Sequence, residues 1–212
     1  MAVYDSQRIM GLIPPSLYRE ELEPGEHKRA QEFSHRHLGQ QWLLHRWLAK
    51  RAIASYTGQR IENICWETTP TGKPIQPTCS VSVSHSANYL AVLLGPGEYN
   101  LGIDCESLRV APLLEQKAIR IIRYFHPADQ ARLKQALEAG CFVPTFLTLW
   151  TRGEALYKLT GSESLVETLG ERPLLDSTLS GRGKEEYSLK TIGSDSRLPC
   201  LLSYACSPRL DE

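Results

Sequence analysis

Three consecutive segments between residues 80 and 106 constrain the fold more than any other part of the sequence. Serine and valine alternate strictly from Ser80 to Ser84, which predicts a half-buried strand. The continuous apolar run Tyr89–Leu94 predicts a fully buried strand. Pro96 and Gly97 then turn the chain into a third expected strand over 100–106. Helical patterns precede and follow these short strands, so the sequence predicts an α+β fold.

The remaining elements lie on both sides of this region. We expect helices over 29–57, 112–123, 127–139 and 144–160, and strands over 61–67 and 198–206. Gly39 is a candidate break in the first helix and Gly58 a candidate stop. Residues 1–26 are expected to be irregular, and 161–198 to be loops around a short strand. In the turn Thr69–Pro74, Gly72 is free to adopt a positive φ and Lys73 projects from the tip.

Each half of the chain therefore holds a helix and several strands. This predicts two α+β lobes, 1–99 and 100–212, divided near residues 97–100. The 212 residues are enough to bury a sizeable core without disulfides or metals as staples. The six cysteines form no CxxC pair and are interpreted as buried, reduced side chains.

Composition limits the functional classes. Lys and Arg number 24, as do Asp and Glu, so the net charge is zero and general nucleic-acid binding is not expected. No apolar run reaches the roughly 18 residues of a membrane span, and the start lacks the pattern of a signal peptide. We expect a cytoplasmic protein without membrane contact.

The neutral total hides a basic stretch. Seven Lys or Arg and one acid, Glu32, lie between His27 and Arg60, together with four of the six histidines. One interpretation is the solvated basic face of a long helix. The other is a site for phosphate groups. The sequence leaves both open.

Carboxylates provide the first candidate chemistry. In a strand, Gly102, Asp104 and Glu106 share one face, and carboxylates two residues apart lie about 7 Å from each other. They repel unless a cation lies between them, and Mg²⁺ with oxygen ligands is the natural choice where phosphates are present. Mn²⁺ would suit the same ligands. Solvated carboxylates on an edge strand are the alternative interpretation.

Two further features add candidates. Glu154 and Lys158 are i,i+4 neighbours on an expected helix, where they form either a surface ion pair or a third carboxylate with a lysine facing phosphate oxygens. His85, between Ser84 and Ser86 at the end of a strand, is either a structural histidine or a contact for an anionic ligand.

Taken together, these motifs resemble the 4′-phosphopantetheinyl transferases, and the length resembles the larger surfactin-synthetase-activating (Sfp-type) branch. The resemblance covers about residues 29–161. It rests on Gly72-Lys-Pro74, Ser84-His-Ser86, Gly102-Ile-Asp-Cys-Glu106 and Trp150-Thr-Arg-Gly-Glu-Ala-Leu-Tyr-Lys158 in that order. Phe125-His-Pro-Ala-Asp129 is similar to the family's Phe-x-x-x-Glu segment.

The resemblance implies a monomeric pseudo-dimer of two similar lobes, with coenzyme A and Mg²⁺ at their interface. Such enzymes move the phosphopantetheine arm of coenzyme A onto a serine of an acyl, peptidyl or aryl carrier protein. By motif position, Asp104, Glu106 and Glu154 are the implied metal ligands, and Glu154 and Lys158 the implied catalytic pair. The implied contacts to coenzyme A are Arg29, Arg46, Gly72, Lys73, Ser84 and His85.

One departure from the family pattern concerns the helix motif. The family usually has Trp-x-x-Lys-Glu-Ala, and this chain has Gly153 at the lysine position. The missing charge suggests weakened activity, and we expect Gly153→Lys to leave activity equal or higher. It also leaves open a module that binds coenzyme A or a carrier protein without transfer. A further alternative is another Mg²⁺-dependent phosphodiester enzyme, such as a nuclease.

Overall fold

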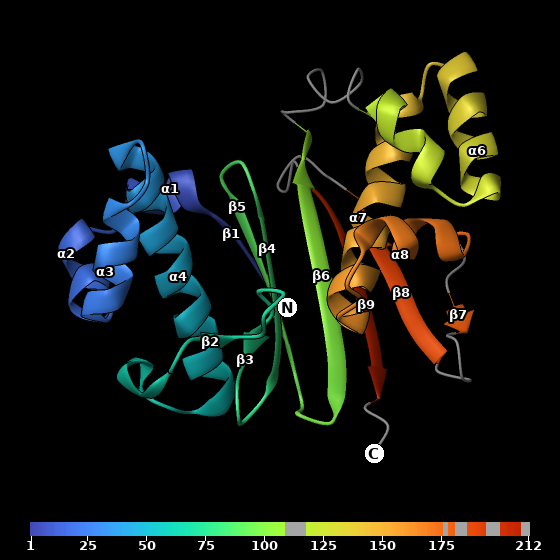
Figure 1. Ribbon diagram of the computed structural model, residues 1–212. Coiled ribbons are helices and arrows are strands. Elements are labelled where there is room, and N and C mark those ends of the chain that lie inside the picture. The colour runs from blue at the N-terminus through green and yellow to red at the C-terminus, as the bar shows by residue number, and fades with distance from the viewer. Residues whose placement is uncertain (109–117, 176–177, 181–185, 194–199, 209–212) are drawn as a thin grey trace.

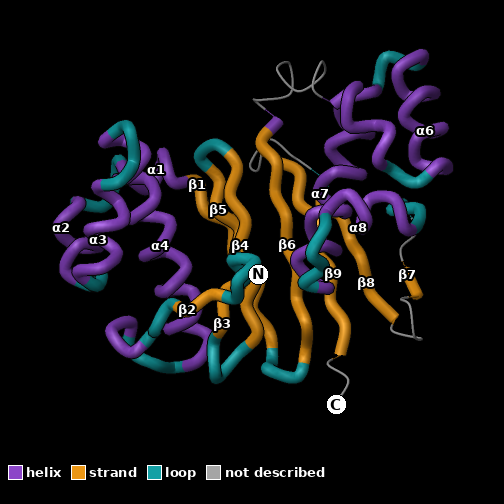
Figure 2. Tube along the Cα trace, viewed as in Figure 1, coloured by secondary structure: helices purple, strands orange, loops and turns teal. Residues whose placement is uncertain are grey.

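Two main antiparallel sheets stand side by side, the first formed by the N-terminal part of the chain and the second by the C-terminal part (Figure 1). Helices α1–α4 cover the outer side of the first sheet, and α7 lies across the second (Figure 2). This mixed architecture agrees with the α+β expectation. The computed structural model describes residues 1–108, 118–175, 178–180, 186–193 and 200–208.

The first sheet has the strand order β1–β5–β4. Its register places Val83 opposite Val92, and Val3 opposite Ala91. The N-terminal residues expected to be irregular instead supply the edge strand β1 and short helices, because pairing with β5 satisfies the backbone of a four-residue segment. The elements are β1 (Ala2–Asp5), α1 (Ser6–Met10), α2 (Pro15–Glu20), α3 (Pro24–Gln31), α4 (Arg36–Thr57), β4 (Ser80–Ser86) and β5 (Tyr89–Gly95).

Helix α4 is the main helix of this half. It ends as predicted at Gly58, which has the left-handed φ of 71°. The expected break at Gly39 is wrong, because the chain is interrupted before Arg36 and Gly39 lies within the helix. A Cβ at Gly39 would lie 2.2 Å from the carbonyl oxygen of Ala30, so glycine allows α3 to pack closely on α4.

The link from α4 to β4 departs from one expectation. Residues 61–67 do not form a strand; they form the 3-10 helix η1 (Ile61–Asn63) and only the start of β2 (Glu67–Thr68). Strand β2 pairs with β3 (Pro74–Ile75). The turn between them follows the prediction, because Gly72 has a φ of +85°.

The second sheet has the order β6–β9–β8–β7, and residues 96–98 link β5 of the first sheet to β6 of the second. Helix α8 lies in the region expected to be loops, and half of the expected helix 112–123 lies outside the described residues; its described part is helical. None of the described helices is long and apolar enough to cross a membrane. The elements are β6 (Tyr99–Ser107), η3 (Ile122–Tyr124), α6 (Pro127–Glu138), α7 (Phe142–Thr160), α8 (Leu165–Glu171), β7 (Thr178–Ser180), β8 (Glu186–Ile192) and β9 (Cys200–Pro208).

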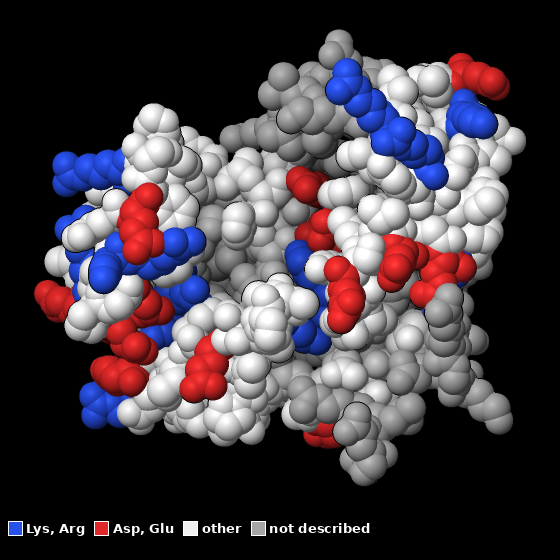
Figure 3. Space-filling model, viewed as in Figure 1, with Lys and Arg blue, Asp and Glu red and all other residues white. Residues whose placement is uncertain are grey.

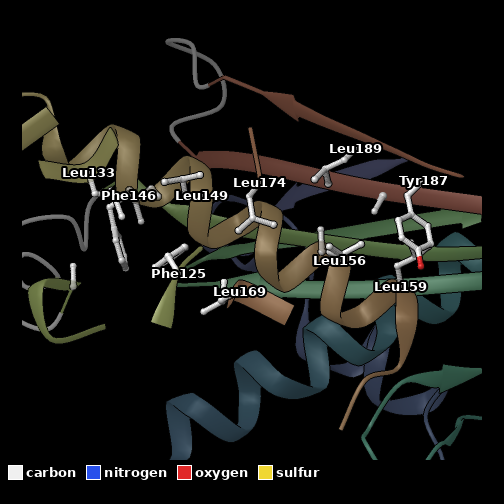
Figure 4. Close-up of a cluster of buried hydrophobic side chains, with 14 of the residues drawn as sticks. Phe125, Leu133, Phe146, Leu149, Leu156, Leu159, Leu169, Leu174, Tyr187 and Leu189 are labelled. Atoms are coloured by element: carbon white, nitrogen blue, oxygen red, sulfur yellow. The ribbon is translucent and has the colours of Figure 1, made fainter. Parts of the chain in front are cut away.

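Buried side chains form three clusters. One lies under α7 and includes Leu156, Leu169 and Leu189 (Figure 4). A second fills the space between α4 and the first sheet. The third joins the two sheets through residues such as Leu93 and Ile103. Cys79, Cys105 and Cys200 are buried free thiols as expected, whereas Cys65 and Cys141 are exposed.

Serine hydroxyls connect β4 to β6 across the boundary of the two sheets. The backbone N–H of Ile103 donates to Ser82 Oγ at 3.0 Å. Two residues further along each strand, Cys105 N–H donates to Ser84 Oγ at 3.3 Å, and Ser107 N–H to Ser86 Oγ at 3.1 Å. We call Ser82, Ser84 and Ser86 the serine seam.

The crossing of α7 over β6 depends on Gly102. A Cβ at this position would lie 1.9 Å from the carbonyl oxygen of Ala155 and 2.6 Å from the backbone nitrogen of Leu159. Neither backbone atom can move without shifting the helix. Glycine therefore brings α7 into direct contact with the strand that carries Asp104 and Glu106.

We predict that Gly102→Ala lowers the free energy of unfolding by about 3 kcal/mol, because the helix must move away from the strand. Urea unfolding followed by circular dichroism measures this loss. Gly97→Ala is the matched control, since a Cβ there meets no atom within 4 Å. Unchanged stability of Gly102→Ala would contradict the close approach.

Candidate active site

A serine, an aspartate and a lysine from three different elements meet at the boundary of the two sheets. Ser84 Oγ donates to Asp104 Oδ1 at 2.7 Å, and Lys158 Nζ donates to the same oxygen at 2.8 Å. Lys158 Nζ also donates to Ser84 Oγ at 3.1 Å. Asp104 is only 5% exposed, and its Oδ2 is buried without a hydrogen-bond partner among the described residues. One carboxylate oxygen is thus paired and the other is available.

Glu106 repeats this arrangement two residues along the strand. Ser86 Oγ donates to Glu106 Oε2 at 2.6 Å while it accepts from Ser107 N–H. Side chains on one face of a strand recur every second residue, so two serines of β4 meet two carboxylates of β6 in register. The predicted common face of Asp104 and Glu106 lies against β4 and α7.

Glu154 joins the cluster from α7. Burial raises its pKa, and the charge of Asp104 raises it further, whereas Lys158 lowers it. Burial also raises the pKa of Glu106, which the hydrogen bond from Ser86 opposes and the charge of Asp104 reinforces. The three carboxylates therefore share one partly desolvated site in which Lys158 is the cation that acts on each of them.

The cluster has some of the features of a metal site. Its ligands are all oxygens, and the unpaired Asp104 Oδ2 is a donor that a hard divalent cation could use. In the arrangement present, however, no three His, Cys, Asp or Glu side chains of the described residues converge closely enough to hold an ion. Lys158 instead supplies the positive charge at Asp104. The oxygen ligands of this cluster therefore suit Mg²⁺ chemically, but the carboxylates would have to move closer together to bind it.

His85 borders the cluster and packs on a second histidine. Its ring lies 5.7 Å from that of His45 on α4, at an angle of 42°. Desolvation and then the charge of Lys158 lower the pKa of His85, and Asp104 opposes this. Burial, followed by His85, lowers the pKa of His45 to about 4. Sequence reasoning missed His45 because nothing in the pattern distinguishes it from the other histidines of the basic stretch.

Lys73 connects the two halves from the β2–β3 turn. Its Nζ donates to the carbonyl oxygen of Leu159, 3.3 Å away near the C-terminal end of α7. A lysine at this end of a helix also interacts favourably with the helix dipole. The turn formed with Gly72 therefore lies beside the helix that carries Glu154 and Lys158.

Arg29 and Arg46 lie in different surroundings. Arg29 is exposed and pairs with Glu32 at 2.5 Å. Arg46 lies 3.4 Å from Glu26 and stacks on Trp42 and Trp66. Burial lowers the pKa of Arg46 to about 10 against the opposing effect of Glu26. In the described part of the chain, no hydrogen bond or ion pair joins either arginine to the Asp104 cluster.

Gly153 faces α8, which corrects the expectation drawn from the missing lysine. A Cβ at this position would lie 2.3 Å from Leu169 Cδ2 and 3.4 Å from Leu174 Cδ1. Both leucines are buried. A lysine at position 153 would meet this apolar packing, so equal or higher activity of Gly153→Lys is no longer expected.

Asp129 fixes the same packing from α6. The side chain is fully buried, and its Oδ2 accepts the backbone N–H of Leu174 at 2.7 Å. The carbonyl oxygen of Leu174 accepts from Arg152 Nε on α7. The segment resembling Phe-x-x-x-Glu therefore holds Leu174 against the helix motif.

The protein thus has a mixed helix–sheet fold, and its cluster of carboxylates with one lysine is of a kind that binds phosphate groups together with a cation. Residues 100–192 match the family model of the 4′-phosphopantetheinyl transferase superfamily. The match covers less than half of the chain but includes Asp104, Glu106, Glu154 and Lys158, and it supports a phosphopantetheinyl transferase function in general. No curated protein matches the chain.

We predict that Gly153→Lys lowers the free energy of unfolding by about 3 kcal/mol, because it forces a long charged side chain between Leu169 and Leu174. Chemical denaturation measures the loss. Glu163→Lys, at an exposed position beyond the end of α7, is the control for adding a lysine. A Gly153→Lys protein as stable as the parent would show that α8 can move away from α7 at little cost, which would contradict tight packing at this position.

We predict that Glu154→Gln raises the midpoint of thermal unfolding at pH 7 in EDTA. The pKa of Glu154 is raised in the folded protein, so the folded state holds this proton more tightly than the unfolded state. The free energy of unfolding therefore falls as the pH rises above 4.5 and the carboxyl ionises. At about pH 4 the carboxyl is mostly protonated in both states, so the gain should shrink. Exposed Glu163→Gln is the control. A lower midpoint at pH 7 would contradict the unfavourable burial of this charge.

Proposed function

We propose that this protein transfers the 4′-phosphopantetheine arm of coenzyme A to a serine of an acyl, peptidyl or aryl carrier protein, as a monomeric Sfp-type enzyme of two similar lobes. The observation that carries this proposal is the contact of Ser84, Asp104 and Lys158 across the two halves. Two of these residues lie in the segment matched by the superfamily model. Figure 3 supports a site here, because acidic and basic side chains both line the hollow between the halves.

Coenzyme A would bind in this hollow with its pyrophosphate near Lys158. The lysine side chain is 25% exposed, so its ammonium is reachable from solvent although it pairs with Asp104. His85 and Lys73 border the same region and are proposed to contact the phosphates, with Gly72 and Ser84 shaping the site. Arg29 and Arg46 remain weaker candidates, since carboxylates already pair with both.

Asp104, Glu106 and Glu154 are the residues proposed to hold Mg²⁺, or Mn²⁺ in its place. When bound, the cation would neutralise charge on the pyrophosphate oxygens. The raised pKa values of Glu106 and Glu154 support this role, because closely spaced carboxylates gain the most from a cation.

Transfer requires a new bond from the carrier serine oxygen to the phosphorus that bears pantetheine. The bond from that phosphorus to adenosine 3′,5′-bisphosphate breaks, and the nucleotide leaves with the electron pair. The serine proton must go to an acceptor within reach, and Glu154 and Lys158 are the candidates among this chain's residues. Lys158, which donates to Asp104, would stabilise the charge on the phosphate oxygens.

The alternatives have less support. A module that binds coenzyme A without transfer was suggested by the missing lysine, but Gly153 faces α8 rather than the carboxylates. A nuclease would need a basic surface along which nucleic acid binds, and the net charge of the chain is zero.

The decisive experiment incubates an apo carrier protein with this protein, coenzyme A and Mg²⁺ and measures the intact mass of the carrier. We predict a gain of about 340 Da, the mass of the transferred arm, and its loss in EDTA. Several carrier types should be tried. Coenzyme A binding by calorimetry without any gain of mass would contradict transfer and favour the binding module.

Variants of the cluster extend this test. Asp104→Asn and Lys158→Met should each reduce the rate by about 100-fold or more, because the first removes a proposed cation ligand and the second removes positive charge beside the reacting phosphate. Glu163→Gln, an exposed position outside the cluster, should retain the parent rate. Circular dichroism confirms folding, and a normal rate in Asp104→Asn would exclude this cluster as the reaction site.

A further inference from the structure

Five of the seven basic side chains between residues 27 and 60 pair with carboxylates, most of which lie in or beside α2 and α3. Lys50 is buried between Glu23 and Glu26, at 3.0 Å from each. The other ion pairs are Arg29–Glu32, Arg46–Glu26, Arg51–Glu21 and Arg60–Glu62. Among the described residues, no carboxylate pairs with Lys28 or Arg36 of this stretch or with Arg19 of α2.

Arg19 and Arg36 line the same groove. It lies between α2, α3 and α4, has a volume of about 590 Å³ and contains no acidic residue in its lining. His27 supplies a third basic group, while Phe33 and Leu43 supply apolar surface. The groove is large enough for a small organic ligand, and its lining combines cationic and apolar parts.

The walls of this groove are fixed by direct contacts. His27 Nε2 donates to the carbonyl oxygen of Arg19 at 2.9 Å, which ties α2 to α3. Gly39 lets the backbone of Ala30 approach α4, which ties α3 to α4. A binding surface held in this way loses little freedom when a ligand binds.

The groove lies across α4 from the candidate active site. Gln41 and His45 of α4 contact Ala87 and His85 at the sheet. Leu43, midway between them in sequence, lines the groove. Successive helix residues turn by about 100°, so Leu43 and the pair Gln41 and His45 project in nearly opposite directions. Figure 1 shows α2 and α3 on the side of α4 away from the strands.

We propose that this groove is a second ligand site, which binds a small phosphate monoester with an apolar or planar body. The guanidinium groups of Arg19 and Arg36 offer the planar, paired donors that recognise phosphate oxygens. His27, whose Nε2 already bonds the Arg19 carbonyl oxygen, would donate to the ligand through Nδ1 in the protonated form of the ring, and Phe33 with Leu43 covers the body of the ligand. The site is separate from the coenzyme A site proposed above and does not depend on it.

Phenyl phosphate is the probe, titrated into the whole protein by calorimetry without coenzyme A, carrier protein or metal. We expect saturable binding with one ligand per chain, about tenfold weaker in Arg19→Gln and in Arg36→Gln, each of which removes charged hydrogen bonds. The two arginines lie on different helices, so a folding defect in one variant leaves the other as a test. Lys28→Gln is the matched control, because Lys28 is exposed on α3 and does not line the groove.

Three outcomes would overturn the proposal. The first is no saturable binding at millimolar phenyl phosphate, and the second is equal weakening in Lys28→Gln. The third is loss of binding in Lys158→Met, which would place the probe in the candidate active site.

Inorganic phosphate should bind more weakly than phenyl phosphate; equal affinity would overturn the role of the apolar surface. Transfer to carrier proteins should be unchanged in Arg36→Gln, so the two proposals can fail separately.

Discussion

The serine seam is the interaction on which the rest of the structure depends. Strand β6 pairs by its backbone with β9 on one side, and on the other its N–H groups donate to Ser82, Ser84 and Ser86. Buried backbone groups need partners, and here side chains supply them in place of a neighbouring strand. The same hydroxyls of Ser84 and Ser86 donate to Asp104 and Glu106. The same serine side chains therefore join the two halves and orient the carboxylates.

This arrangement concentrates negative charge where water is scarce. Burial is the largest cause of the raised pKa values of Glu106 and Glu154, and Asp104 adds to both. Lys158 offsets part of this repulsion through its contact with Asp104. Sites that handle charged substrates often lose stability in this way, because groups arranged for ligands repel each other without them.

The period of the strands explains which parts of the site could be predicted from sequence. The alternation at Ser80–Ser84 predicted β4, and the spacing of Asp104 and Glu106 predicted their common face. The sequence could not show that the serine face of β4 is also buried, because its partner β6 comes from the other half. Strand β1 was missed because its four residues gain order only by pairing with β5. The resemblance implied a phosphate contact for Arg46, and the sequence could not show that acids and tryptophans come together around this side chain in the folded chain.

The departure at Gly153 has a structural explanation that leaves the candidate chemistry intact. Glu154 and Lys158 are one turn apart and face β6, whereas Gly153 faces Leu169 of α8. Leu174 completes this packing, and its backbone is held by Asp129 and Arg152. The absent side chain thus allows α8 to lie against α7 from behind the site. The packing of α7 on α8 therefore leaves Glu154 and Lys158 on the other side of the helix, next to Asp104.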